Sequence, residues 1–220
     1  MQNGTDKYAL FVSPHPDDLE LSCAISLQKF KSLGYKTLVV VVCSGEAAGD
    51  PETREAEARQ GAEILGADEI VFLRYPQFKM LEDRARIKDA LENIILQYVP
   101  EYVFVPWKED THEDHVYAAQ AAVVAARGVR SVYYYPTPTS LNFTPDTLLA
   151  GDRVMLENKT RALGVHQSQI NTQRVQAAYP GIASEYWKLS FGHHSRFSLN
   201  SVDREGASVE VFKVYKQELL

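Results

Sequence analysis

The stretch YALFVSPHPDDLELSCA, residues 8–24, joins an apolar run to a turn and then to a helical pattern. Its first five residues, YALFV, predict a β-strand. The turn that follows places His15, Asp17 and Asp18 within four positions. An ordinary turn can use a proline and an aspartate, but it needs neither a histidine nor two adjacent carboxylates. A metal site needs such side chains, so this turn is the first candidate for one.

The alternation of apolar runs and helical patterns continues along the chain. Further strands are predicted at 37–43, 69–73, 102–106 and 131–135. Helices are predicted from Leu19 to Gly34, at 51–66, along the apolar stripe 87–98, at 113–126 and at 156–169. The segment 207–217 alternates and could form an edge strand or an irregular arm. This order predicts an α/β, Rossmann-like three-layer fold, in which helices flank a mostly parallel central sheet.

Length and composition are those of a globular protein. The 220 residues fit a single domain spanning 1–220. The net charge of −6 and the lack of a long basic run argue against nucleic acid or a membrane surface as the main partner. No apolar segment has the length that a bilayer span requires, and the N-terminus shows no signal-peptide pattern. Cys23 and Cys43 lie inside apolar patterns, which is typical of reduced core cysteines, so a cytoplasmic location is expected.

A second cluster of titratable residues lies in VPWKEDTHEDHVYAAQ, residues 105–120. His112 and His115 are three positions apart at a predicted helix start, with Asp114 between them. Both clusters directly follow predicted strands, and ligands of parallel sheets bind at the carboxyl ends of strands. We therefore expect both at the same edge of the sheet. Taken singly, each also has an ordinary explanation, as a turn with a helix start or as a surface helix pair.

Histidines and aspartates brought together in this way suit a catalytic metal. Zinc in enzymes usually takes three nitrogen or oxygen ligands from the protein and activates a water molecule. A carboxylate outside the ligand set can accept a proton, and a histidine can stabilise an oxyanion. The residue pattern does not by itself choose between Asp17 and Asp18 as a ligand.

The paired motifs SPHPDDLELSCA and VFVPWKEDTHEDH resemble the PIG-L/LmbE-like family of zinc-dependent N-acetylglucosamine deacetylases. The resemblance covers most of the chain, with weaker matches at CSGEAAGD, REAEARQGAEILG, KTRALGVHQSQ and REGASVEVFKVY. One departure is LSCAIS after the first motif, where the family usually has glycines. No proposed ligand is lost by it.

The resemblance implies a ligand set and a base. His15, Asp18 and His115 would be the ligands of one zinc ion per chain, and Asp17 would be the general base. A set of two histidines and one aspartate also suits other divalent metals, such as Fe²⁺.

The resemblance also implies roles for three further residues. His112 would stabilise the oxyanion or act as a general acid. Asp114 would orient His112 or couple to its charge. Arg54 would reach the sugar or its substituent.

The expected activity is removal of the acetyl group from a small N-acetylated molecule, an N-acetylglucosaminyl conjugate or a related amino sugar. The alternatives are a metal-dependent amidohydrolase acting on a non-sugar acyl amide, a non-catalytic sugar-binding module, and a phosphoesterase. The loops 74–82 and 136–152 match no family pattern and are expected to form the outer wall of the pocket. The part of the chain after about 136 would supply pocket walls and oligomer contacts, since the resemblance allows a homo-oligomer.

Other candidate residues have two interpretations each. Glu46 and Asp50 could bind substrate or simply be solvated. Trp107 could stack on a sugar ring or pack in the core. His166 could approach the site or belong to a helix end. The adjacent pair 193–194, both histidines, makes a poor chelate in a strand because neighbouring side chains point to opposite faces.

Overall fold

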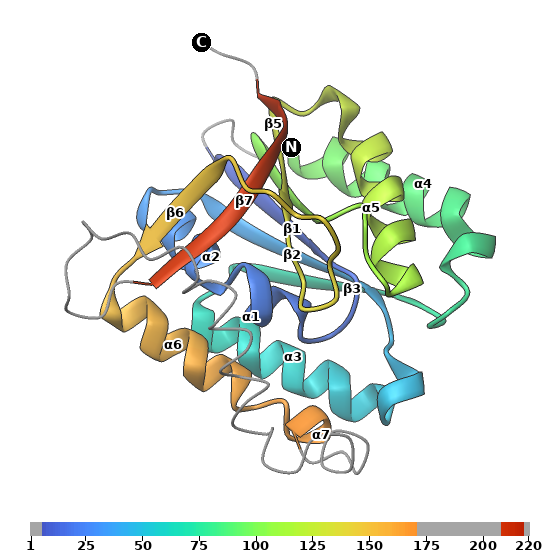
Figure 1. The fold of residues 1–220 in the computed structure, drawn as a ribbon, viewed down its shortest axis with the longest axis horizontal. Coiled ribbons are helices and arrows are strands. Elements are labelled where there is room, and N and C mark those ends of the chain that lie inside the picture. The colour runs from blue at the N-terminus through green and yellow to red at the C-terminus, as the bar shows by residue number, and fades with distance from the viewer. Residues whose placement is uncertain (1–5, 171–207, 218–220) are drawn as a thin grey trace.

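The computed structural model describes residues 6–170 and 208–217 (Figure 1). The strands are β1 (Tyr8–Ser13), β2 (Lys36–Cys43), β3 (Glu69–Tyr75), β4 (Tyr102–Pro106), β5 (Ser131–Tyr135), β6 (Thr147–Gly151) and β7 (Ser208–Gln217). The helices are α1 (Asp18–Ser22), α2 (Ala24–Ser32), α3 (Pro51–Leu65), α4 (Met80–Tyr98), α5 (Glu113–Ala125), α6 (Arg153–Leu163) and α7 (Gln167–Ile170). Short 3-10 turns lie at Glu46–Ala48 and Ala126–Gly128. The histidine pair at 193–194 lies outside the described residues.

The described strands form one seven-stranded sheet in the order β3-β2-β1-β4-β5-β7-β6. The five strands from β3 to β5 are parallel, whereas β7 runs antiparallel to both β5 and β6. The predicted mostly parallel α/β sheet is therefore confirmed. The expectation of one domain over 1–220 stays a prediction.

The C-terminal part of the sheet differs from the prediction. Residues 208–217 form an interior strand between β5 and β6, and not an edge strand or an irregular arm. The segment 136–152, predicted to be a loop, contains β6, which forms the edge. Alternating burial marks a strand with one covered face, but it carries no information about which strands lie on either side.

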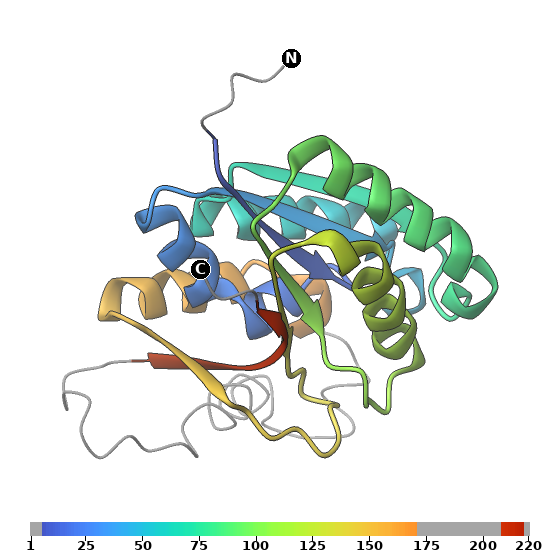
Figure 2. The same ribbon diagram turned by 90° about the horizontal axis from the view of Figure 1, so that it is seen from above.

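Helices cover both faces of the sheet, as Figures 1 and 2 show. Side chains of β1 alternate between the faces, as expected for a pleated strand. Leu10 and Val12 join the core under α4 and α5, while Ala9 and Phe11 join the core under α1, α2 and α3. All four are at most 1% exposed, so β1 is buried on both faces and lies at the centre of the molecule.

Three helices differ from their predicted bounds. The single helix predicted at 156–169 begins earlier and is broken after Leu163, so α6 is followed by the separate short helix α7. The helix predicted after the first turn is broken at Cys23, whose φ of −132° separates α1 from α2. The free amides at the start of α2 donate to the Glu210 carboxylate of β7, a partner nearly two hundred positions away. Helix α4 begins at Met80, before the apolar stripe on which its prediction rested. Helix α3 follows its prediction, with Asp50 as its N-cap.

The position of β1 determines where the site forms. Strand β2 pairs with one edge of β1 and β4 with the other. The chain therefore leaves β1 toward one side and later returns to the other. The carboxyl ends of two such strands border the crevice in which open α/β sheets bind ligands. The turn 14–17 and the loop 107–112 meet at this crevice.

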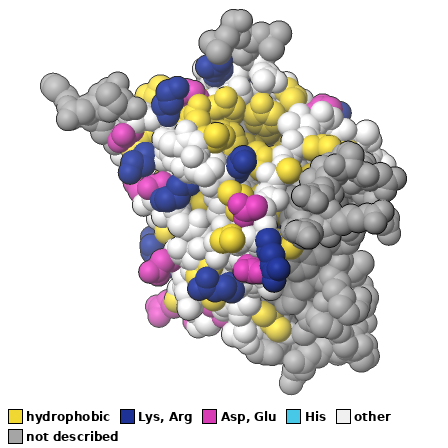
Figure 3. Space-filling view, turned by 90° about the vertical axis from the view of Figure 1, so that its left-hand side faces the viewer, with side chains coloured by type: hydrophobic (Ala, Val, Ile, Leu, Met, Phe, Trp, Pro, Cys, Tyr) yellow, Lys and Arg dark blue, Asp and Glu magenta, His cyan; other side chains and the backbone are white. Residues whose placement is uncertain are grey.

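Charged side chains of both signs lie on the side of the molecule that Figure 3 shows, and they are intermixed over the described residues. Among the helices of the described residues, none combines the length and the apolar composition that crossing a bilayer requires. The prediction that neither nucleic acid nor a membrane is a partner stays a prediction.

Candidate metal centre and active site

The turn after β1 folds back on itself and brings His15 and Asp18 together. The His15 carbonyl accepts hydrogen bonds from Ser13 Oγ at 2.7 Å and from the Asp17 amide at 3.0 Å. The His15 amide donates to Asp18 Oδ2 at 2.9 Å. Asp18 is the first residue of α1, where a carboxylate is favoured by the free amides of the helix start. Local hydrogen bonds therefore define this half of the site.

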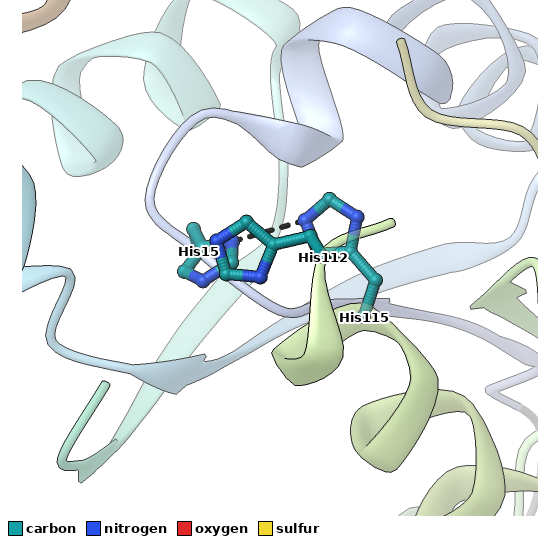
Figure 4. A group of neighbouring side chains, drawn as sticks. All are labelled: His15, His112 and His115. Carbon is teal, nitrogen blue, oxygen red and sulfur yellow. Dashed lines mark hydrogen bonds between the residues drawn. The ribbon is translucent and has the colours of Figure 1, made fainter. Parts of the chain in front are cut away.

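Helix α5 supplies the other half. Nδ1 of His15 lies 3.1 Å from Nε2 of His115, a residue one hundred positions later (Figure 4). Asp18 Oδ2 lies 3.1 Å from the same His15 nitrogen and 3.4 Å from the same His115 nitrogen. The three atoms form a nearly equilateral triangle, and the three side chains are at most 7% exposed.

This triangle has the dimensions of a metal-ligand set. Ligand atoms about 2.1 Å from a tetrahedral ion lie roughly 3.4 Å apart, close to the distances observed here. In the described residues, His15, His112 and His115 also have ligand atoms within 4.8 Å of one another, and so do His15, Cys43 and Asp114. The geometry admits His112 as well as Asp18 as the third ligand.

A carboxylate lies behind each of the two imidazoles of the triangle. His15 Nε2 is 3.2 Å from Asp114 Oδ2, and His115 Nδ1 is 3.1 Å from Asp110 Oδ2. Metal-ligating histidines usually place their second nitrogen against such an acceptor, which fixes the tautomer and the ring orientation. Both histidines therefore direct their inner nitrogen at the same point. The residues present fit a divalent metal ion.

Asp110 and Thr137 are site residues that the sequence analysis missed. Thr137 Oγ1 donates to Asp110 Oδ2 at 2.6 Å, and it also lies 3.2 Å from His115 Nδ1. Asp110 is five positions before His115, and Thr137 follows β5, the strand next to β4. The sequence signals that could have found them are an acidic residue in the loop before α5 and a hydroxyl residue just after β5, the strand next to β4.

The charges in the triangle reinforce one another. Burial favours the neutral acid, but His115 and His15 hold the pKa of Asp18 well below its usual range. Burial also opposes protonation of His115, but Asp18 and Asp110 raise its pKa to about 9. The pKa of His15 is raised well above its usual range against the effect of burial, by Cys43, Asp114 and Asp18. Binding of a cation at these nitrogens therefore requires release of their protons.

His112 is held in a different state. It is the N-cap of α5, and its Nδ1 accepts the Asp114 amide at 3.3 Å. Its ring lies between Phe78, at 5.4 Å and 10°, and His115, at 4.7 Å and 15°. Burial and the nearby His15 and His115 lower the pKa of His112 to about 4. Since Nδ1 accepts, the proton of the neutral ring is on Nε2, which leaves that nitrogen as a hydrogen-bond donor.

Asp114 does not contact His112 through its carboxylate. Its two oxygens accept the Phe78 amide, each at 3.1 Å, and one of them also faces His15. Its negative charge still acts on the His112 ring by favouring the protonated form. The contacts favour orientation of His15 as the role of Asp114, and its effect on His112 stays a prediction.

Arg54 of α3 is buried and faces Asp17. Its guanidinium lies 3.3 Å from Asp17 Oδ2 and donates to the carbonyls of Gly45, at 2.9 Å, and Pro16, at 3.3 Å. Only 2% of Arg54 is exposed, so these contacts favour positioning of Asp17. A contact between Arg54 and the substrate stays a prediction. Burial raises the pKa of Asp17 above its usual range, although Arg54 acts in the opposite direction.

The remaining candidate residues have contacts within the protein. Trp107 packs in the core and donates from its indole to the Leu141 carbonyl, which leaves no free face for a sugar. Asp50 caps α3, and Glu46 accepts the Gln77 amide. His166 is buried with its Nε2 3.4 Å from Glu20 of α1. Both cysteines are free and buried, as predicted.

Comparisons with known proteins identify the family. The model of the PIG-L family, GlcNAc-PI de-N-acetylase, matches residues 10–126. An uncharacterized deacetylase of Escherichia coli (strain K12), YaiS, is 30% identical over 169 residues, which are 74% of this chain and 91% of the relative. The chain belongs to the PIG-L family. It is an N-deacetylase that hydrolyses amide bonds.

Solved structures share the whole fold. The conserved protein TT1542 from Thermus thermophilus is 25% identical with a TM-score of 0.74, and the match covers 96% of each chain. The N,N'-diacetylchitobiose deacetylase from Pyrococcus horikoshii is 18% identical with a TM-score of 0.76, over 96% of this chain and 84% of that one. The 4-carboxy-2-hydroxymuconate hydratase GalB from Pseudomonas putida KT2440 is 19% identical with a TM-score of 0.77, over 97% and 98%. The same fold therefore also occurs in an enzyme of another reaction class.

Proposed function

We propose that this protein removes the N-acetyl group from an amino sugar, an N-acetylglucosaminyl conjugate or a close relative, with one zinc ion held by His15, Asp18 and His115. The observation that carries the proposal is the triangle of three buried ligand atoms, with a carboxylate behind each imidazole. The two free, buried cysteines support a cytoplasmic setting.

The metal would supply Lewis-acid activation of a water molecule and of the acyl carbonyl. Asp17 accepts the proton that the water loses, and its raised pKa brings it closer to that of an efficient proton carrier. Arg54 holds the Asp17 carboxylate in place. The same proton then passes to the nitrogen of the leaving amine. The products are acetate and the free amino sugar.

His112 contributes as a neutral donor. Its Nδ1 accepts a backbone amide, so the Nε2 proton is available to the oxygen on which negative charge develops. The low pKa of His112 keeps the ring neutral at working pH, so oxyanion stabilisation is favoured over general acid catalysis for this residue. The hydrogen bond at Nδ1 and stacking on His115 keep the ring from turning.

The choice of an amino sugar rests on relatives. The family model is named for the de-N-acetylation of GlcNAc-PI, and one similar structure is an N,N'-diacetylchitobiose deacetylase. Other similar structures are deacetylases of the glycopeptide antibiotic teicoplanin and of the A40926 pseudoaglycone. We propose the acetylated hexosamine ring as the recognised part, and we leave the group attached to it open.

The experiment is acetate release from a panel of N-acetylglucosamine derivatives by protein stripped of metal and then reconstituted with zinc, iron(II) or cobalt. Activity that disappears with the metal and returns with zinc supports the proposal. Asp17→Asn is expected to lower kcat by about 10²–10⁴-fold while zinc binding is kept. Asp50→Asn is the matched control, because this carboxylate at the same edge only caps α3, a role that asparagine fills equally well.

Two results would contradict the proposal. Full activity in folded, zinc-loaded Asp17→Asn would remove the base from the mechanism. If the protein binds zinc but releases acetate from no sugar, the metal site is supported and the amino-sugar substrate is not. The substrate would then be another acyl amide.

A further inference from the structure

Phe78 has an unusual backbone for its residue type. It lies in the connection between β3 and α4 with a φ of 61°, in the left-handed region that residues other than glycine rarely adopt. Such conformations cost free energy, persist only where the surrounding structure imposes them, and cluster at functional sites. Phe78 therefore marks a position at which a conformational cost is tolerated.

The site itself holds this conformation. The Phe78 amide donates to both oxygens of Asp114, each at 3.1 Å. Asp114 is fully buried and also orients His15, so the backbone of Phe78 is tied to the candidate ligand set. The ring lies parallel to His112, with centroids 5.4 Å apart and planes 10° apart. Both the backbone and the side chain thus place the ring beside the predicted oxyanion donor.

Most of this ring is nevertheless not covered. Phe78 is 54% exposed, whereas Trp107, the aromatic residue after β4, is 5% exposed. Burial of apolar surface is the usual reason for an aromatic residue in a fold, and it accounts for Trp107 but not for Phe78. One face of the Phe78 ring lies on His112, so the exposed part of the ring lies beside the predicted oxyanion donor.

We propose that Phe78 is a specificity-determining residue whose exposed face stacks on the sugar ring that carries the scissile N-acetyl group. The inference rests on the proposed function, since it places a ring next to the amide. The C–H groups on one face of a pyranose form an apolar surface that packs on an aromatic ring. A short acyclic amide lacks this surface, so Phe78 would select ring-borne acetamides over other acyl amides.

The experiment measures kcat and KM of zinc-loaded variants on the methyl glycoside of N-acetylglucosamine and on N-acetylethanolamine, which carries the same acetamide without a ring. In Phe78→Ala we expect KM for the glycoside to rise roughly five- to tenfold, with kcat within twofold. The kcat and KM for N-acetylethanolamine stay the same as in the wild-type protein. If the wild-type protein does not hydrolyse N-acetylethanolamine, the variant does not either. Phe78→Tyr restores the low KM for the glycoside. Leu96→Ala, which removes a 72% exposed side chain near the end of α4, leaves both constants unchanged.

A glycine variant separates the ring from the backbone. Phe78→Gly keeps the hydrogen bond from the residue-78 amide to Asp114, and glycine adopts the left-handed conformation without strain. The Tm of Phe78→Gly should therefore exceed that of Phe78→Ala. The two variants should nevertheless show the same rise in KM, because both lack the ring. Binding of the deacetylated methyl glycoside, measured by calorimetry, should weaken by the same factor and gives a readout that does not depend on turnover.

The outcomes distinguish this inference from the proposed function. Wild-type protein that releases no acetate from any sugar overturns both. If the wild-type protein is active, a fall in kcat with unchanged KM in Phe78→Ala would show that the ring only positions His112. Equal losses on both substrates, or no change on either, would also overturn the stacking role.

Discussion

Replacing Glu210 by alanine is expected to destabilise the protein strongly, although Glu210 lies outside the active site. One carboxylate oxygen accepts the Ile25 amide at 3.0 Å and Lys159 Nζ at 2.9 Å. The other accepts the Ser26 amide at 2.8 Å and the Ser26 hydroxyl at 2.6 Å. The side chains of Glu210 and Lys159 are 0% and 1% exposed. Glu210 therefore joins β7, α6 and the start of α2.

The magnitude follows from what the substitution leaves behind. Removing one partner of a buried ion pair costs about 3–5 kcal/mol, because the remaining charge stays buried without a counter-charge. Glu210→Ala leaves the Lys159 ammonium buried without a counter-charge. It also leaves two amides at the start of α2 without their acceptor. For a chain of this length, the loss corresponds to a fall in Tm of roughly 6–20 °C.

The assay is urea unfolding followed by circular dichroism and tryptophan fluorescence. Glu157→Ala is the matched control, because its ion pair with Arg153 has the same 2.8–2.9 Å separation but side chains that are 58% and 78% exposed. That control should change the free energy of unfolding by less than about 1 kcal/mol. The double variant Glu210→Leu/Lys159→Met should recover most of the loss, since an apolar pair leaves no buried charge.

A change below about 1 kcal/mol in Glu210→Ala, with an unchanged m-value, would refute the reasoning. It would mean that the buried charge and the amides find water or other partners. Failure of the double variant to recover stability would point instead to the helix-start amides as the larger contribution.

Two other substitutions test buried polar groups near the sheet. Burial opposes protonation of His166, but Glu20 raises the pKa of His166 above its usual value of 6.5. The stabilisation that results is fully present below pH 6.5 and is lost as the pH rises through the raised pKa of the folded state. His166→Gln should therefore lower the free energy of unfolding more at about pH 6 than at about pH 9, and a pH-independent cost would contradict the assignment. Tyr135→Phe removes the hydrogen bond from the buried Tyr135 hydroxyl to the Val12 carbonyl, at 2.6 Å, and should cost about 1–2 kcal/mol by urea unfolding. A cost near zero there would mean that the Val12 carbonyl is satisfied without it.

The order of elements up to β5 could be predicted because local patterns determine it. Strand β2 is apolar on both faces, and such a run indicates a strand between two helical layers. Helix α3 begins after the capping residue Asp50 and ends at Gly66. The loss of pattern after Tyr135 had a physical reason, since β6 is short and half-exposed and β7 alternates without indicating its neighbours.

The sequence by itself determined which residues could form a site. The two motifs follow strands that run parallel, and the carboxyl ends of such strands meet at one edge whatever the details of packing. Their spacing within each motif also follows from local structure, since the turn 14–17 and the start of α5 form from hydrogen bonds between near neighbours.

Only the tertiary structure decided how these residues face one another. That β1 lies between β2 and β4 brings His15 to His115, and this order depends on strand pairing across the whole chain. The structure places the Asp114 carboxylate on His15 and Asp110 on His115. It also places the Phe78 ring on His112. These contacts join residues from separate elements, and no local pattern encodes them because the partners meet only when the sheet has formed.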